Sequence, residues 1–137
     1  YWGVYDPVER PDANFAAAYL GGEPEDYDVV NEGQLVDGSM TAYNAMRGLS
    51  GLQDTAQYER MKQHLDVPAY IDYVLLHFYT GHQDWFTDKN WYALRRRAPG
   101  EGLRYLAWDG ELMLNSPTQN IVTRTDQPSD LHPKLLA

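Results

Sequence analysis

The feature that most constrains the fold is an apolar segment in the middle of the chain, "LDVPAYIDYVLLHFYTG" at residues 65–81. Apolar side chains recur in it at spacings of three and four residues, which is the period of an α-helix with one apolar face. The side chains on this period are Ile71, Val74, Leu75 and Phe78. Pro68 suits the first turn of such a helix, and Gly81 is placed to end it. The segment therefore predicts a buried helix.

Shorter elements are predicted before this helix. "YWGVY" at residues 1–5 has β-propensity throughout, and "YDVV" at residues 27–30 predicts a second short strand. Helices are predicted where a capping residue precedes a helix-forming run: Asp12 before "ANFAAAYL", Ser39 or Thr41 in "SMTAYNAMRGL", and Asp54 before "TAQYERMKQHL". "NEGQLVDGS" at residues 31–39 indicates a turn-rich connection. The expected class is α+β.

A polar loop and a β-hairpin are predicted after the central helix. The loop spans residues 82–89, and two β-patterned runs, "NWYALRRR" and "LRYLAWD", flank "APGEG". The dipeptide Pro99-Gly100 is a strong turn signal. A turn centred on it would pair Asn90 with Asp109, and directly opposed residues have Cβ atoms about 4.5–5.5 Å apart. Asp84, on the loop, could reach the same open end of the hairpin.

These three side chains would form an oxygen-rich site. Magnesium prefers hard oxygen ligands, with phosphate oxygens and water completing its shell, and a second Asp could accept the proton of a substrate hydroxyl. Protein kinases arrange catalytic base, metal-binding Asn and metal-binding Asp in this order. The spacing here is Asp-x5-Asn, where the standard kinase loop has Asp-x4-Asn. Asp and Asn are also ordinary turn formers, and the spacing alone favours that plainer interpretation.

Other side chains near the loop have structural interpretations. Trp85, Trp91 and Trp108 are typical packing residues, and His77 on the helix is expected to be structural. The arginines at residues 95–97 indicate a solvated strand face, on which one guanidinium could bind phosphate. His82 is the histidine nearest to the cluster, either as a catalytic group or as a hydrogen-bonding loop residue. Asp88 is the alternative to Asp84 as the catalytic carboxylate.

The charge distribution limits the partners of the chain. Its 137 residues suit one domain, and its net charge of −9 is concentrated in residues 1–37, which hold nine acidic residues and one basic residue. Binding to nucleic acid or to an anionic membrane through bulk charge is therefore not expected. The acidic residues could instead solvate a surface or face a basic partner. The absence of cysteine excludes disulfides and Cys-based zinc sites. No apolar run approaches the roughly 20 residues of a membrane span.

Several blocks of the sequence resemble a known family. "YWGVYDPVERPDANF" resembles the Y-x-G-x-Y-x-x-x-E-x-x-D-x-x-F segment of the spore-coat protein H (CotH) kinase-like family. "YDVV", "YIDYVLLHFYTGHQDWFTDKNWYALRRR" and "LRYLAWDGELML" are similar to its later blocks, in the same order. The resemblance covers essentially the whole chain. His82 stands where the family pattern G-N-x-D-W has Asn.

This resemblance implies an atypical protein-kinase-like fold and a phosphotransferase activity. Members of the family bind ATP with Mg²⁺ or Mn²⁺ and phosphorylate protein side chains. By position, the resemblance implies that Asp84 is catalytic, that Asn90 and Asp109 hold metal, and that Glu111 supports the metal from the same strand face. Glu9 would contact the nucleotide. The expected localisation is a bacterial cell surface or the extracellular space, with the spore coat as one example.

The resemblance also implies a domain layout. Residues 1–137 would form a single partial kinase-like domain, in which residues 1–12 are the last small-lobe strand and the hinge. Residues 13–137 would be the large-lobe core, truncated at the C-terminus. The phosphate-binding Lys and its Glu partner should precede the hinge, and the lysines here (Lys62, Lys89 and Lys134) all follow it. The piece alone is therefore expected to be inactive.

Two other functions are compatible with the same residues. A non-catalytic kinase-like module could act as a surface or coat interaction protein, with its acidic first 37 residues docking a basic partner. A metal-dependent phosphoesterase could use the same oxygen ligands, and it would release phosphate from an ester without a nucleotide. The sequence leaves the acceptor residue and the oligomeric state open.

Overall fold

The computed structural model describes residues 3, 7–86, 88–124, 131 and 135. These residues form a mixed α+β fold, and the predicted strand at residues 1–5 lies outside them apart from Gly3. The α-helices are α1 (Ala13–Leu20), α2 (Thr41–Gly48), α3 (Thr55–Met61) and α4 (Val67–Thr80). The strands are β1 (Tyr27–Asn31), β2 (Gln34–Asp37), β3 (Trp91–Arg96) and β4 (Arg104–Ala107). Two 3-10 helices are also present among the described residues: η1 (Pro24–Asp26) precedes β1, and η2 (Gly110–Leu112) follows β4.

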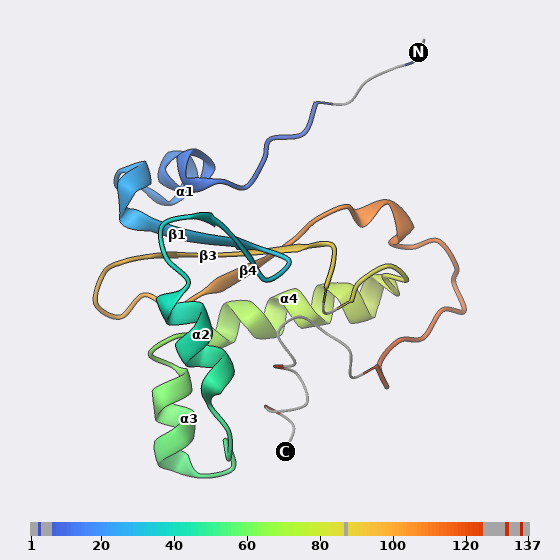
Figure 1. Ribbon diagram of the computed structural model, residues 1–137. Helices are drawn as coiled ribbons and strands as arrows, with labels where there is room; N and C mark the ends of the chain where they lie inside the picture. Colours follow the sequence, from blue (N-terminus) through green and yellow to red (C-terminus); the bar gives the residue numbers. More distant parts are fainter. Residues whose placement is uncertain (1–2, 4–6, 87, 125–130, 132–134, 136–137) are drawn as a thin grey trace.

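The four strands form one antiparallel sheet in the order β2-β1-β3-β4. Figure 1 shows α1 on one face of the sheet, with α4 on the other and α2 and α3 at its side. Successive residues of β3 point to opposite faces, as the strand period requires. Trp91 and Ala93 join the larger apolar cluster with α4, whereas Tyr92 and Leu94 join the smaller cluster with α1. Strand β3, which begins directly after Asn90, is therefore buried on both faces.

The predicted helix caps at Asp12 and Asp54 are confirmed. The Asp12 carboxylate accepts a hydrogen bond from the Phe15 N–H at 3.0 Å, and Asp54 accepts from the first turn of α3. These bonds satisfy backbone donors that have no partner within the helix. Asp66 does the same for α4, where Pro68 occupies the first turn and Gly81 ends the helix in the left-handed conformation. The local sequence therefore sets where the helices begin and end.

The buried face of α4 differs from the predicted stripe. Ile71 and Leu75 are 51% and 56% exposed. The buried residues of the helix are Val67, Tyr70, Tyr73, Val74, His77 and Thr80. Tyr70 and Tyr73 turn inward, where their rings contact Tyr105 and Trp85 under the sheet. Within the described residues, no helix combines the length and the apolar character that a membrane span requires.

The segment expected to be a turn-rich connection contains strand β2. Residues 27–37 form a hairpin, with Asn31 opposite Gln34. Its two turn residues, Glu32 and Gly33, have φ angles of 52° and 80°. Two successive left-handed residues make the turn that matches the twist of paired strands. Because β1 also pairs with β3, this hairpin belongs to the sheet that carries the candidate site.

The register of the β3–β4 hairpin differs by one residue from the prediction. Trp91 pairs with Ala107, and the Trp108 N–H donates to the Asn90 carbonyl at 3.2 Å, so Asn90 lies opposite Trp108 and not opposite Asp109. The turn at Pro99-Gly100 is present, with the Glu101 N–H donating to the Ala98 carbonyl. The shift arises because the chain between the turn and β4 is hydrogen-bonded to the segment before α4.

Leu103 makes the hydrogen bonds that attach the returning chain to the segment before α4. Its N–H donates to the His64 carbonyl at 2.7 Å, and its carbonyl accepts from the Asp66 N–H at 3.0 Å. Gly102 permits this approach, since a Cβ there would collide with the backbone of residues 65–66. The segment leading to α4 therefore competes with β3 for the returning chain, and β4 starts only at Arg104.

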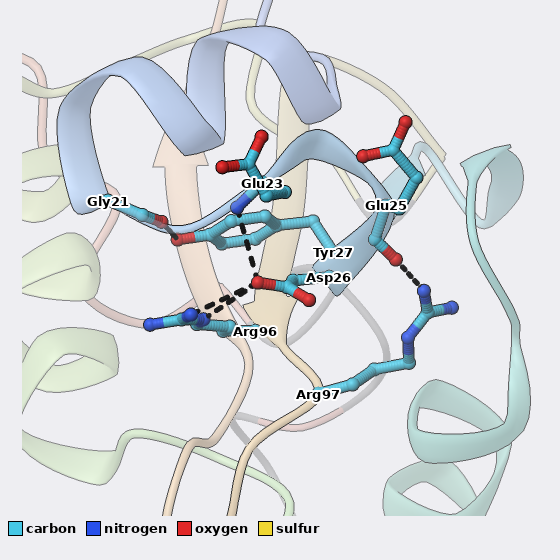
Figure 2. A network of polar contacts seen from close by, with 7 residues as sticks. All are labelled: Gly21, Glu23, Glu25, Asp26, Tyr27, Arg96 and Arg97. Carbon is cyan, nitrogen blue, oxygen red and sulfur yellow. Dashed lines mark hydrogen bonds and ion pairs between the residues drawn. The ribbon is translucent and has the colours of Figure 1, made fainter.

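The arginines at the end of β3 are partly neutralised within the molecule. Figure 2 shows Arg96 and Arg97 reaching the segment before β1. Arg96 forms an ion pair with Asp26 at 3.0 Å, and Arg97 contacts the Glu25 carbonyl and pairs with Asp28 at 3.2 Å. A backbone hydrogen bond from Glu23 and the Arg96 guanidinium lower the pKa of Asp26. Part of the acidic N-terminal region is therefore engaged inside the fold.

Candidate functional site

Trp85 anchors the loop that carries Asp84. The indole is fully buried, and its Nε1 donates to the Tyr73 hydroxyl at 2.7 Å. Its ring stacks on His77 with centroids 4.3 Å apart. These contacts attach the loop to α4, so the neighbouring Asp84 lies at a fixed place beyond the end of the helix. In Figure 1 this loop and the segment after β4 lie at the same end of the sheet.

Asn90 and Asp84 are in direct contact. The Asn90 amide Nδ2 donates to the Asp84 carbonyl at 2.6 Å and to the Asp84 carboxylate at 3.2 Å. Asn90 is only 6% exposed and has a φ of 66°, in the left-handed region. The structure therefore brings together the candidate base and one of the candidate metal ligands, as the sequence predicts.

The amide orientation of Asn90 follows from these two bonds. Nδ2 is occupied by Asp84, and among the described residues no donor bonds to the amide oxygen Oδ1. An Asn side chain binds a hard cation through its oxygen. The contact with Asp84 thus leaves Oδ1 as the atom available to a cation or to solvent.

Asp109 and Glu111 follow β4 in a turn. Asp109 has a φ of 50° and precedes η2, and both side chains are exposed. The prediction that they share one strand face is wrong, because β4 ends at Ala107 and Glu111 lies in the 3-10 helix. The main chain at Asp109 is close to the site, since the preceding residue, Trp108, donates its N–H to the Asn90 carbonyl at 3.2 Å.

Lys89 forms an ion pair with the Asp84 carboxylate. Its hydrogen bond is the largest cause that lowers the pKa of Asp84, and the hydrogen bond from Asn90 adds to it while desolvation opposes it. Asp84 is therefore ionised at neutral pH and can accept a proton. The Lys89 ammonium also lies over the Phe86 ring, 5.2 Å from its centroid.

Two histidines form a buried pair behind the loop. His77 and His82 are both fully buried, and their Nδ1 atoms are 2.8 Å apart. A hydrogen bond of this kind requires one ring to donate and the other to accept. Burial, reinforced by His82, lowers the pKa of His77 to about 3. Burial also lowers the pKa of His82, while the Asp109 backbone and the charges of Asp84 and Asp109 oppose that shift.

We expect His77 to make the fold sensitive to acid. An unfolded His has a pKa of about 6.5, so below that pH His77 becomes protonated in the unfolded chain while it stays neutral in the folded chain. The folded state is therefore most stable, as far as His77 is concerned, above pH 6.5. Its free energy of unfolding falls by on the order of a few kcal/mol as the pH decreases towards 3. Denaturant titrations between pH 7 and pH 4 should show a shallower decline for His77→Gln than for the unmodified protein. Parallel declines would contradict this assignment.

The residues present suit a cation that also binds phosphate. Among the residues that the structure describes, no three His, Asp or Glu side chains are grouped to hold a metal. Magnesium needs fewer, because it is usually held by one or two carboxylates together with substrate phosphates and water. Asn90 Oδ1 and the exposed Asp109 carboxylate match that donor set, and Glu111 lies two residues further along.

Glu9 lies in the segment before α1. Its carboxylate accepts a hydrogen bond from the Tyr19 hydroxyl at 2.8 Å, and this contact raises the pKa of Tyr19. Both side chains are exposed. The contact ties the segment to α1, and no contact of Glu9 with Asp84, Asn90 or Asp109 is present among the described residues.

Two residues of the site were missed by sequence reasoning. Lys89 directly precedes Asn90 in the sequence, but no sequence pattern indicates that its ammonium pairs with Asp84. Glu32 accepts a hydrogen bond from the Asn90 N–H at 2.8 Å, across 58 positions of sequence. Only the pairing of β1 with β3 could have indicated this contact, and that pairing has no local sequence signal.

Comparisons with known proteins identify the family of the chain. No curated protein and no solved structure gives a significant match to the chain. The model of one family, described as "CotH kinase protein", matches residues 1–134 of the 137. Because this match covers nearly the whole sequence, the chain belongs to the CotH kinase protein family.

Proposed function

We propose that the chain carries the catalytic core of an ATP- and divalent-metal-dependent kinase that phosphorylates protein side chains. The observation that carries the proposal is the pair of hydrogen bonds from Asn90 Nδ2 to Asp84. They hold a candidate base and a candidate metal ligand as one unit beside Asp109. Membership of the CotH kinase protein family supports the same reaction class.

Each residue has a chemical role in this proposal. Asp84, ionised beside Lys89, would accept the proton of the substrate hydroxyl. Asn90 Oδ1 and Asp109 would hold Mg²⁺ or Mn²⁺, with Glu111 supporting the cation from η2. A bound cation would neutralise the charge of the transferred phosphate, which is the main requirement of phosphoryl transfer. Lys89 would keep Asp84 ionised and oriented.

The proposal includes a domain layout and a class of substrate. Residues 13–137 would form the large-lobe core, and residues 1–12 would form the last small-lobe strand and the hinge, with Glu9 near the nucleotide. The protein substrate would carry basic groups. Asp26 and Asp28 are engaged in ion pairs with Arg96 and Arg97, and the other acidic side chains described in the first 37 residues would attract this substrate.

Calorimetry of the protein at its full natural length tests this function. ATP with Mn²⁺ should release heat on binding, and the same titration with a chelator present should lose most of it, because the cation joins the phosphates to Asn90 and Asp109. A non-catalytic module that docks basic partners should give no metal-dependent heat. Release of phosphate from a simple ester without ATP would favour a phosphoesterase instead.

A further inference from the structure

Glu32 occupies an unusual position at the tip of the β1–β2 hairpin. Its φ of 52° lies in the left-handed region, where Asn, Asp and Gly are the residues usually found in such turns. Figure 1 shows this tip beside the start of β3, in agreement with the pairing of Asn31 and Tyr92. The side chain of Glu32 is only partly exposed. The hydrogen bond of its carboxylate with the Asn90 N–H explains why a glutamate occupies this turn.

Two hydrogen bonds join the hairpin tip to the residues that begin β3. Glu32 Oε1 accepts from the Asn90 N–H at 2.8 Å, and the Glu32 N–H donates to the Trp91 carbonyl at 3.3 Å. A carboxylate that accepts from a backbone N–H makes a stronger bond than a neutral acceptor does. The tip of one hairpin is thereby attached to the base of the other.

These bonds fix Asn90 from both sides. Its N–H is held by Glu32, and its carbonyl accepts from Trp108 at 3.2 Å. With both main-chain groups held, the left-handed backbone of Asn90 has little freedom, and its side chain leaves it in one direction. Asn90 Nδ2 donates to the carbonyl and the carboxylate of Asp84, so Oδ1 points away from Asp84.

We infer that Glu32 is the positioning residue for Asn90 in cation binding. The inference rests on the proposed function, because it assumes that Asn90 Oδ1 is a ligand of Mg²⁺ or Mn²⁺. Glu32 acts through the backbone of Asn90, so it affects how well the oxygen is presented and leaves the chemical step to Asp84. Partners that orient a metal ligand typically change metal affinity by about 10–100-fold when they are removed.

The variants Glu32→Ala and Glu32→Gln test this role in the protein at its full natural length. Glu32→Ala should raise the KM for Mn²⁺ by about tenfold or more, while kcat at saturating Mn²⁺ stays within about threefold. Glu32→Gln keeps an oxygen acceptor at the same reach, so its KM should return to within about threefold of the unmodified value. Asp72→Ala, at an exposed site on α4 whose side chain makes no hydrogen bond or ion pair among the described residues, is the control and should change neither constant.

Hydrogen exchange of the Asn90 N–H gives a readout that does not depend on activity. The amide should exchange faster in Glu32→Ala than in the unmodified protein, and Glu32→Gln should restore most of the protection. Unchanged exchange and an unchanged KM for Mn²⁺ in Glu32→Ala would overturn the inference. A fall in kcat that Glu32→Gln fails to restore would also overturn it, since it would indicate general damage to the fold.

The same two measurements separate this inference from the proposed function. An unmodified protein without metal-dependent transfer would overturn the proposed function and, with it, the role of Glu32 in cation binding. Metal-dependent transfer in the unmodified protein, combined with a Glu32→Ala variant that behaves identically, would overturn the role of Glu32 alone. If Glu32→Ala does not fold, Glu32→Asp takes its place, because Asp suits the left-handed backbone and its shorter side chain loses the reach to the Asn90 N–H. It should show the raised KM and the faster exchange, and the absence of both changes would overturn the inference.

Discussion

Replacement of Asp109 by alanine is expected to remove metal-dependent phosphate transfer from ATP in the protein at its full natural length. The side chain is exposed after β4, and the preceding residue, Trp108, donates its N–H to the Asn90 carbonyl at 3.2 Å. A bound cation contributes several kcal/mol of transition-state stabilisation, and each 1.4 kcal/mol is about a factor of ten in rate. We therefore expect kcat/KM to fall by about a thousandfold, measured with ATP, Mn²⁺ and a protein acceptor.

Two further variants make this result specific. Asp72→Ala changes an exposed carboxylate on α4 and should leave transfer unchanged. Asp109→Asn keeps a residue that adopts the left-handed backbone readily, so it separates loss of the carboxylate from disturbance of the turn. If Asp109→Asn retains full activity, the carboxylate is not a ligand. Undiminished transfer by Asp109→Ala would remove Asp109 from the site altogether.

Asp84→Asn should lower turnover and leave nucleotide binding largely intact. General bases typically contribute 10²–10⁴-fold, and an amide cannot take up the proton of the substrate hydroxyl. The Asn90 Nδ2 would keep its 2.6 Å bond to the main-chain carbonyl of residue 84, so the arrangement of the metal ligands should survive. A fall of about a hundredfold or more in kcat, with heat of ATP–Mn²⁺ binding close to that of the unmodified protein, is the expected result.

Asp88→Asn is the matched control for that experiment. Asp88 is exposed on the same loop, four residues after Asp84 and next to Lys89. The contacts with Lys89 and Asn90 belong to Asp84, which is why we assign the proton transfer to it. A large loss of turnover in Asp88→Asn, with little change in Asp84→Asn, would reverse this assignment.

The local parts of the site could be predicted from the sequence. Asp84 and Asn90 lie six residues apart on one loop, and the helix before that loop has clear start and stop signals at Pro68 and Gly81. The β-propensity of the runs around Pro99-Gly100 likewise gave the correct strands. In each case the determining interactions lie within a few residues of one another, where residue types carry the information.

The long-range parts could not be predicted. The register of β4 depends on the bonds of Leu103 to His64 and Asp66, which lie almost 40 positions earlier in the chain. Strand β2 is short and has no apolar alternation strong enough to distinguish it from a turn. The contact of Glu32 with Asn90 depends on the β1–β2 hairpin and on the pairing of β1 with β3, so no local pattern indicates it. Tertiary pairing decided these features.

The left-handed backbone at Asn90 and Asp109 restricts which side chains could serve there. With φ angles of 66° and 50°, both positions disfavour β-branched and bulky residues, and they are most easily occupied by Gly, Asn or Asp. Of those three, only Asn and Asp carry a side-chain oxygen. The main chain at this end of the sheet thus admits few residue types other than those that can bind a hard cation. An exchange of Asn and Asp between the two positions should therefore be accommodated by the fold far better than Val or Thr at either one.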